Sequence, residues 1–154
     1  MTVRSSVITS KIWILCPNLR GARLFQFKNF QTEIEFMREF PRPTPLPRDA
    51  DFPEEFDADV DRKHTDIKLQ EVIAKSFSKF LVREMTASLD RKEFDQFIVC
   101  AESHFLEIFL SYLGPHLKGR LLGSASLDLY NVNESDLMSY VRDILPPAYY
   151  KSAS

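Results

Sequence analysis

The chain has 154 residues, 44% of them hydrophobic, and a formal net charge of -2 at pH 7. This length and apolar content predict one globular domain over residues 1–154. The near-neutral charge excludes a global basic field, so any anion site must be local. No stretch approaches the ~20 apolar residues of a membrane span, and the first residues lack a secretion-signal pattern, so we expect a cytoplasmic protein.

Three apolar runs in the first forty residues predict an antiparallel meander. Residues 11–16 and 22–28 are β-rich runs separated by turn formers, and residues 32–40 alternate apolar with acidic side chains. Trp13 has apolar neighbours, which favours core packing over base stacking. Cys16 and Cys100 each lie inside an apolar run, a position typical of structural buried thiols.

A proline-rich acidic segment, residues 41–66, follows the meander. Prolines stand at positions 41, 43, 45, 47 and 53, and four basic against eight acidic side chains leave a charge of -4. Because proline removes backbone donors and favours extended chain, we expect a mobile, solvated loop between strand 3 and the first helix. The prolines lack P-x-x-P spacing, and the acidic triplet from Asp57 to Asp61 lacks the glycine and closing glutamate of a calcium loop.

Helical and strand patterns alternate in the remaining chain. An apolar stripe predicts a helix over residues 66–90, and the wholly apolar run 97–101 predicts a central strand that is covered on both faces. Residues 102–113 begin with a capping pair and continue at helical spacing, and residues 117–129 predict a peripheral strand. The last helix is expected after Asn133.

This element order predicts an α/β fold with a mixed five-stranded sheet of order 3-2-1-4-5. Strand 2 is antiparallel, helices cover both faces, and the topology is ribonuclease-H-like. In open α/β sheets, ligands bind at the carboxyl ends of strands where the strand order reverses. The expected site therefore lies near residues 17–20, residues 101–104 and the start of the final connection.

Positive charge near this edge suggests an anion site. The candidates are Arg20, Arg23, His104, Lys118 and Arg120, assisted by the helix amino terminus at Ser103. A phosphate, with RNA as one source, is the expected ligand. The alternative is ordinary solvated surface, which is favoured because Glu102 would weaken anion binding.

The sequence predicts no catalytic residue, metal ligand or cofactor. Ser103 and His104 lack a nucleophile elbow, and the three histidines lack metal-ligand spacing. Walker and Rossmann glycine motifs are absent from the sequence. The predicted core strands also lack the clustered carboxylates of a two-metal nuclease.

Several stretches carry a family resemblance. They are the opening WILCPNLRGARLFQF, Arg62-Lys63-His64, the segment FSKFL, the run FDQFIVCAESHFLEIF and the end HLKGRLLGSASLDLYNVNESDL, with Asp128-Leu129 in the family's Asp-Leu position. Over nearly its whole length the chain resembles the bacterial host-attachment family, proteins required for attachment to host cells. That family is distantly similar to the central domain of archaeal and eukaryotic peptide-chain release factors.

The chain departs from both patterns at defined places. With glycine only at 21, 114, 119 and 123, it has no Gly-Gly-Gln loop, and Asp61-Arg62 runs directly into Lys63-His64 where family members have an Asp-Arg-Pro-Gly-Arg segment. The resemblance implies a non-enzymatic protein that acts through a macromolecular partner. The rival hypotheses are an RNA- or ribosome-associated factor, and a hydrolase in which a pocket joins His104 to a serine or carboxylate.

Overall fold

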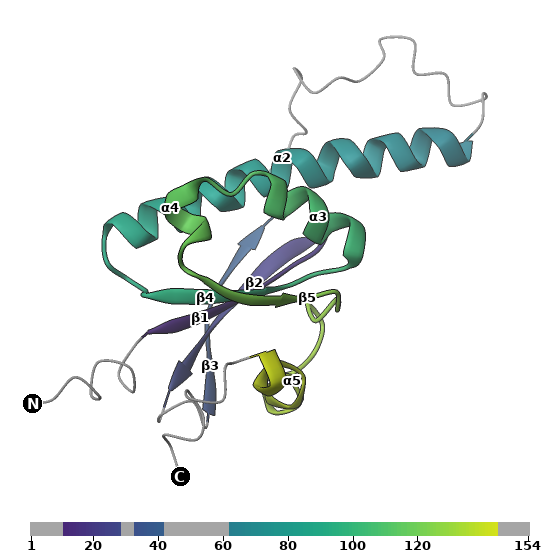
Figure 1. The fold of residues 1–154 in the computed structure, drawn as a ribbon. Coiled ribbons are helices and arrows are strands. Elements are labelled where there is room, and N and C mark those ends of the chain that lie inside the picture. Colours follow the sequence, from purple (N-terminus) through teal and green to yellow (C-terminus); the bar gives the residue numbers. More distant parts are fainter. Residues whose placement is uncertain (1–10, 29–32, 42–61, 145–154) are drawn as a thin grey trace, which may run out of the picture.

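A computed structural model of the protein describes residues 11–28, 33–41 and 62–144, with side chains from residue 68 onwards in the last range (Figure 1). These residues form a mixed sheet with helices on both faces. The elements in chain order are β1 (Ile12–Pro17), β2 (Gly21–Lys28), β3 (Glu33–Pro41), α2 (Arg62–Asp90), β4 (Gln96–Cys100), α3 (Ser103–Ser111), α4 (Pro115–Lys118), β5 (Leu121–Ala125), α5 (Glu134–Val141) and the 3-10 helix η1 (Arg142–Ile144).

The sheet has the strand order β3-β2-β1-β4-β5, which confirms the predicted order. β2 is antiparallel to both β1 and β3, while β1, β4 and β5 are parallel. Because the central strands β1 and β4 are parallel and buried, their carboxyl ends lie side by side at one edge of the sheet. That edge is also where the chain leaves β1 towards β2 and leaves β4 towards β5.

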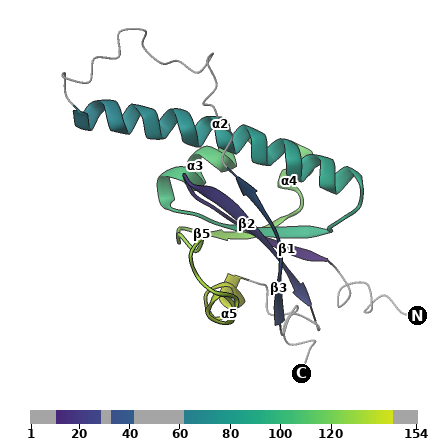
Figure 2. The same cartoon turned by 180° about the vertical axis from the view of Figure 1, so that it is seen from behind.

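Each face of the sheet has its own apolar core. In Figures 1 and 2, α2, α3 and α4 cover one face and α5 covers the other. The successive apolar residues of β4 divide between the two cores, since Phe97 and Val99 pack with the α2 side and Ile98 and Cys100 with the α5 side. This explains the unbroken apolar run, because each such side chain contributes about 1.5 to 3 kcal/mol when fully buried.

The single tryptophan and both cysteines lie in these cores, as the sequence predicts. Trp13 is 3% exposed, its Nε1 donates to Gln26 Oε1 at 2.9 Å, and its ring stacks on Phe94 at 4.6 Å between centroids. Cys16 and Cys100 are free and buried. A hydrogen bond that the Cys16 thiol makes to Cys100, together with burial, raises the pKa of Cys16 well above its ordinary value.

Two element boundaries differ from the predictions. α2 begins at Arg62 rather than near residue 66, so the end of the predicted 41–66 loop is helical. Residues 42–61 of that loop lie outside the described residues. The start of the predicted strand 117–129 is instead the short helix α4, because Pro115 suits a first helical position and Gly114 precedes it in an extended conformation. β5 is correspondingly short.

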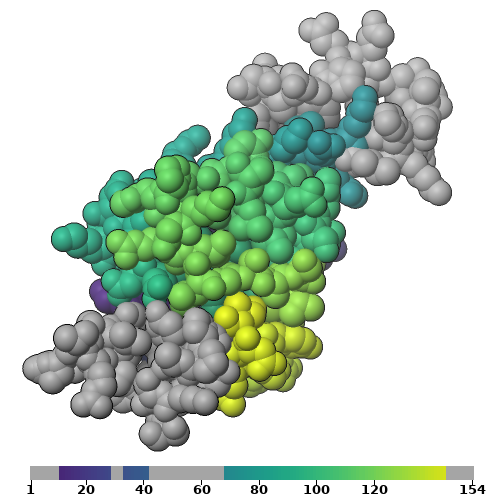
Figure 3. Space-filling view, viewed as in Figure 1, coloured from purple at the N-terminus to yellow at the C-terminus, as the bar shows by residue number. Residues whose placement is uncertain are grey.

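Local backbone geometry is tightly constrained at the end of α2 and in the middle of β5. α2 ends in a Schellman turn in which Glu93 N donates to Ser88 O at 3.0 Å, with Lys92 at a φ of 60°. Gly123 of β5 lies against η1, and a Cβ there would stand 2.7 Å from Ile144 Cγ2. In the space-filling view the surfaces of β5 and α5 adjoin (Figure 3).

No helix within the described ranges has the length and apolar character that crossing a membrane requires.

Candidate functional site

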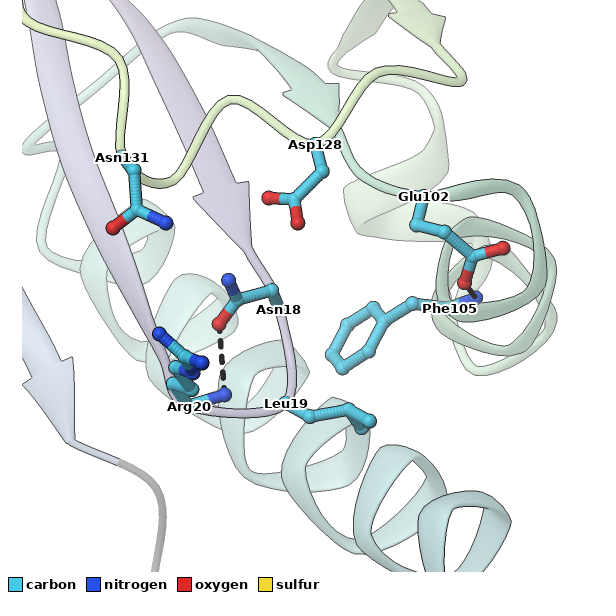
Figure 4. A pocket seen from close by; sticks show the side chains of 7 residues that line it. All are labelled: Asn18, Leu19, Arg20, Glu102, Phe105, Asp128 and Asn131. Atoms are coloured by element: carbon cyan, nitrogen blue, oxygen red, sulfur yellow. Dashed lines mark hydrogen bonds between the residues drawn. The ribbon is translucent and has the colours of Figure 1, made fainter. Parts of the chain in front are cut away.

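A cleft of about 330 Å³ opens at the carboxyl ends of β1 and β4 (Figure 4). We call it the carboxyl-edge cleft. Three connections supply its lining, which consists of Asn18, Leu19, Arg20, Glu102, Phe105, Asp128 and Asn131. The cleft lies at the edge where strand order reverses, which is where the sequence places a site. That it binds a ligand stays a prediction.

The β1–β2 turn forms one wall and is held by Asn18. Its Oδ1 accepts hydrogen bonds from Arg20 N at 2.7 Å and Gly21 N at 3.2 Å, and its own N–H donates to Gly21 O at 2.8 Å. The Asn18 oxygen therefore stabilises the turn, while its amide nitrogen is directed towards the cleft (Figure 4).

The start of α3 forms a second wall, where Glu102 is the N-cap. The Glu102 carboxylate accepts hydrogen bonds from His104 N at 2.9 Å and Phe105 N at 3.3 Å. These are the donors that an anion at this helix terminus would need, and they are already bound by a negative charge. Phe105, with Leu19, gives the cleft an apolar side.

The β5–α5 connection forms the third wall and is tied to the far strands. Arg23 Nη1 donates to the carbonyl oxygens of Tyr130 at 3.1 Å and Val132 at 3.2 Å. The Tyr130 hydroxyl hydrogen-bonds to the Glu39 carboxylate, and this bond, together with desolvation, raises the Tyr130 pKa. Asp128 Oδ1 accepts from Tyr130 N at 3.2 Å, and in Figure 4 the carboxylate points into the cleft.

A glycine permits the close approach of this connection to the β1–β2 turn. A Cβ at Gly21 would lie 3.1 Å from the Tyr130 hydroxyl and 3.2 Å from the Phe40 carbonyl oxygen. The carbonyl belongs to the β2–β3 pairing and has little freedom to move. A side chain at position 21 would therefore require the Tyr130 hydroxyl and the Phe40 carbonyl to shift by a few tenths of an ångström.

The structure does not bring the predicted cations together. Arg20 lines the cleft, whereas Arg23 is bound behind the β5–α5 connection. Lys118 ends α4 and Arg120 immediately precedes β5, where its carbonyl accepts from Phe97 N at 3.0 Å. Because β5 runs parallel to β4, both residues lie at the amino edge, about 13 Å along the strands from the cleft. The structure therefore does not group them with Arg20, and the binding of an anion by any of these residues stays a prediction.

Ser103 and His104 also lie apart from the lining of the cleft. Both are exposed on the first turn of α3, and neither is among the seven lining residues. The carboxylate nearest to His104 in the described residues is that of its neighbour Glu102, which accepts the hydrogen bond from His104 N at 2.9 Å. The pocket that the hydrolase hypothesis requires at His104 does not coincide with this cleft.

Sequence reasoning placed residues 17–20 at the site but did not single out the Asn18 side chain, and it did not name Asp128 or Asn131 as lining residues. All three follow the ends of strands, which is the signal that could have identified them. Among the described residues, the lining carries one cation and two carboxylates and includes no Ser, Thr, Cys, His, Lys or Tyr. Within the described part of the chain, no three His, Cys, Asp or Glu side chains are close enough together to hold a metal ion.

Searches of curated proteins and of solved structures give no evidence about the family. A search of curated proteins found no match. A solved structure described as an archaeal protein is similar at 16% identity and a TM-score of 0.48, over 92% of this chain and 36% of its own. This chain therefore spans little more than a third of that protein. The ribonuclease-H-like classification and the release-factor similarity stay predictions.

The family match covers most of the chain. The model of the family described as protein required for attachment to host cells matches residues 13–141, from β1 to the end of α5. This range includes every residue that lines the carboxyl-edge cleft. The chain belongs to the family of proteins required for attachment to host cells.

Proposed function

We propose that this host-attachment family member acts without catalysis, by binding a macromolecular partner at the carboxyl-edge cleft. One observation carries the proposal: hydrogen bonds hold three separate connections around a cleft whose described lining offers hydrogen-bond donors and acceptors but no nucleophile paired with a base. Such a lining is suited to recognition. A cytoplasmic location and an indirect role in attachment remain parts of this proposal.

The chemistry of the cleft gives an RNA or ribosomal partner little support. Phosphate groups would meet the carboxylates of Glu102 and Asp128, and Arg20 is the single cation in the part of the lining that the structure describes. Co-sedimentation with ribosomes at low and high salt tests that alternative directly. Stable, salt-sensitive co-sedimentation would favour the RNA-associated function over the one proposed here.

The proposed function is tested by blocking the cleft. Asn131 is exposed, and among the described non-glycine residues only Lys92 has a positive φ, so Asn131→Trp fills the cleft without backbone strain. Glu107→Trp, on the exposed face of α3, is the matched control. Cells of the source organism that lack the gene are complemented with each variant, and their attachment to host cells is counted.

We expect Asn131→Trp to fail in complementation and Glu107→Trp to succeed, with both proteins folded by circular dichroism and present at equal levels. Full attachment by cells that carry folded Asn131→Trp protein would show that the cleft has no part in the function.

A further inference from the structure

We infer that the occupant of the carboxyl-edge cleft is a lysine or arginine side chain of a protein partner, with its charged head bound by Asp128. The inference rests on the proposed function and specifies the chemistry of the partner. It follows from the way the two carboxylates of the cleft are used, from the apolar side of the cleft, and from its size.

The two carboxylates differ in what they can still accept. Glu102 is directed at the first turn of α3, where two backbone N–H groups bind it. Asp128 accepts one hydrogen bond, from Tyr130 N to Oδ1, and its carboxylate points into the cleft between Asn18 and Asn131 (Figure 4). An ionised carboxylate has about four acceptor positions, so Asp128 retains capacity for a charged donor.

The rest of the lining fits the stem and backbone of such a side chain. Leu19 and Phe105 form an apolar side against which a methylene chain can pack while its head remains polar. The Asn18 amide nitrogen and the Arg20 guanidinium are donors suited to carbonyl oxygens of the partner's backbone.

The size of the cleft agrees with one inserted side chain. Its volume of about 330 Å³ lies at the lower end of the roughly 300 to 1,000 Å³ of small-molecule pockets. The walls are also held in place before any partner arrives, by the Asn18 turn, the Glu102 cap and the two Arg23 hydrogen bonds. Binding therefore requires little reordering of this chain.

Titration of the full-length, 15N-labelled protein with blocked pentapeptides tests the inference. The peptides carry Arg, Lys, norleucine or Glu between glycines, and inorganic phosphate and a short RNA oligonucleotide serve as anionic probes. The side-chain amide signals of Asn18 and Asn131 report on the cleft. Asp128→Asn removes the charge but keeps an oxygen for Tyr130 N, and Glu107→Gln is the matched control for loss of one exposed negative charge.

We expect saturable shifts of both amide signals with the Arg and Lys peptides, and weaker ones with norleucine. Asp128→Asn should weaken binding of the Arg peptide about three- to fivefold, as expected for one partly exposed ion pair. Glu107→Gln should leave the affinity unchanged. Tighter binding of the Glu peptide, phosphate or RNA, or equal weakening by both variants, would overturn the inference.

The two proposals fail separately. If the basic peptides do not bind but Asn131→Trp still abolishes attachment, the cleft functions with an occupant of different chemistry and only this inference is wrong. If the peptides do not bind and Asn131→Trp attaches normally, both proposals are wrong.

Discussion

Replacing Arg23 with methionine should destabilise the protein, because Arg23 binds the β5–α5 connection that forms one wall of the cleft. The substitution removes two charged hydrogen bonds, to the carbonyl oxygens of Tyr130 and Val132, and the stacking of the guanidinium 5.0 Å from the Phe25 ring centroid. Since Arg23 is only partly buried, each hydrogen bond contributes about 1 kcal/mol and the stacking about 0.5 kcal/mol. The free energy of unfolding should fall by about 2 to 3 kcal/mol, and the thermal midpoint by about 4 to 12 °C.

Trp13 is the natural reporter for this measurement, because it is the single tryptophan and is buried. Urea unfolding followed by its fluorescence gives the free energies of wild type, Arg23→Met, Arg23→Lys and the exposed control Arg83→Met. Arg83→Met should lie within about 0.5 kcal/mol of wild type. Arg23→Lys should restore only part of the loss, because lysine lacks the planar fork. The reasoning is refuted if Arg23→Met matches wild type, or if lysine restores stability fully.

Three further substitutions have defined outcomes. Lys92 has a φ of 60°, a left-handed backbone conformation that glycine adopts without steric strain. Lys92→Gly should therefore raise the free energy of unfolding by about 0.5 to 1 kcal/mol in urea titrations. A decrease would contradict backbone strain at Lys92. Gly123→Ala puts a methyl group 2.7 Å from Ile144 Cγ2 and should lower the thermal midpoint of unfolding. The control Gly119→Ala, whose new methyl group has its nearest neighbouring atom at 3.5 Å, should preserve or raise that midpoint. Equal midpoints for the two variants would be inconsistent with a close contact at Gly123. The pKa of Tyr130 is raised in the folded protein, so its protonated hydroxyl stabilises the fold. This stabilisation is complete below the Tyr130 pKa of the unfolded chain, about 10, and is lost as the pH rises through the Tyr130 pKa of the folded protein. Alkaline unfolding curves of Tyr130→Phe should therefore fall less steeply than those of wild type, and identical slopes would exclude the linkage.

The sheet could be predicted because its strands have unambiguous patterns. β1 and β4 are apolar at successive positions, and only a strand that is covered on both faces accommodates such a run. Once β4 is central, the order of the remaining strands follows from short, right-handed connections. The cleft's position follows from that order, which is why residues 18–20 and the start of α3 were correctly expected at one edge.

Element ends and side-chain partners were not predictable in the same way. The first turn of α2 is polar and gives no apolar period to mark its start, and α4 is too short for a period to show. Arg23 was expected to face a ligand, but its partners are carbonyl groups more than a hundred residues away, which no local pattern encodes. The position of Arg120 is a different case: the parallel direction of β5, which the predicted sheet already implied, places the residue before this strand at the amino edge.

Reversing the charge at Asp128 tests the recognition chemistry most directly. The affinities of the Arg and Glu pentapeptides are measured by the same amide shifts for wild type and for Asp128→Lys, with Glu107→Lys as the control for net charge. Wild type and Glu107→Lys should both prefer the Arg peptide, and Asp128→Lys should prefer the Glu peptide. An unchanged preference in folded Asp128→Lys protein would contradict recognition of a basic side chain at this cleft.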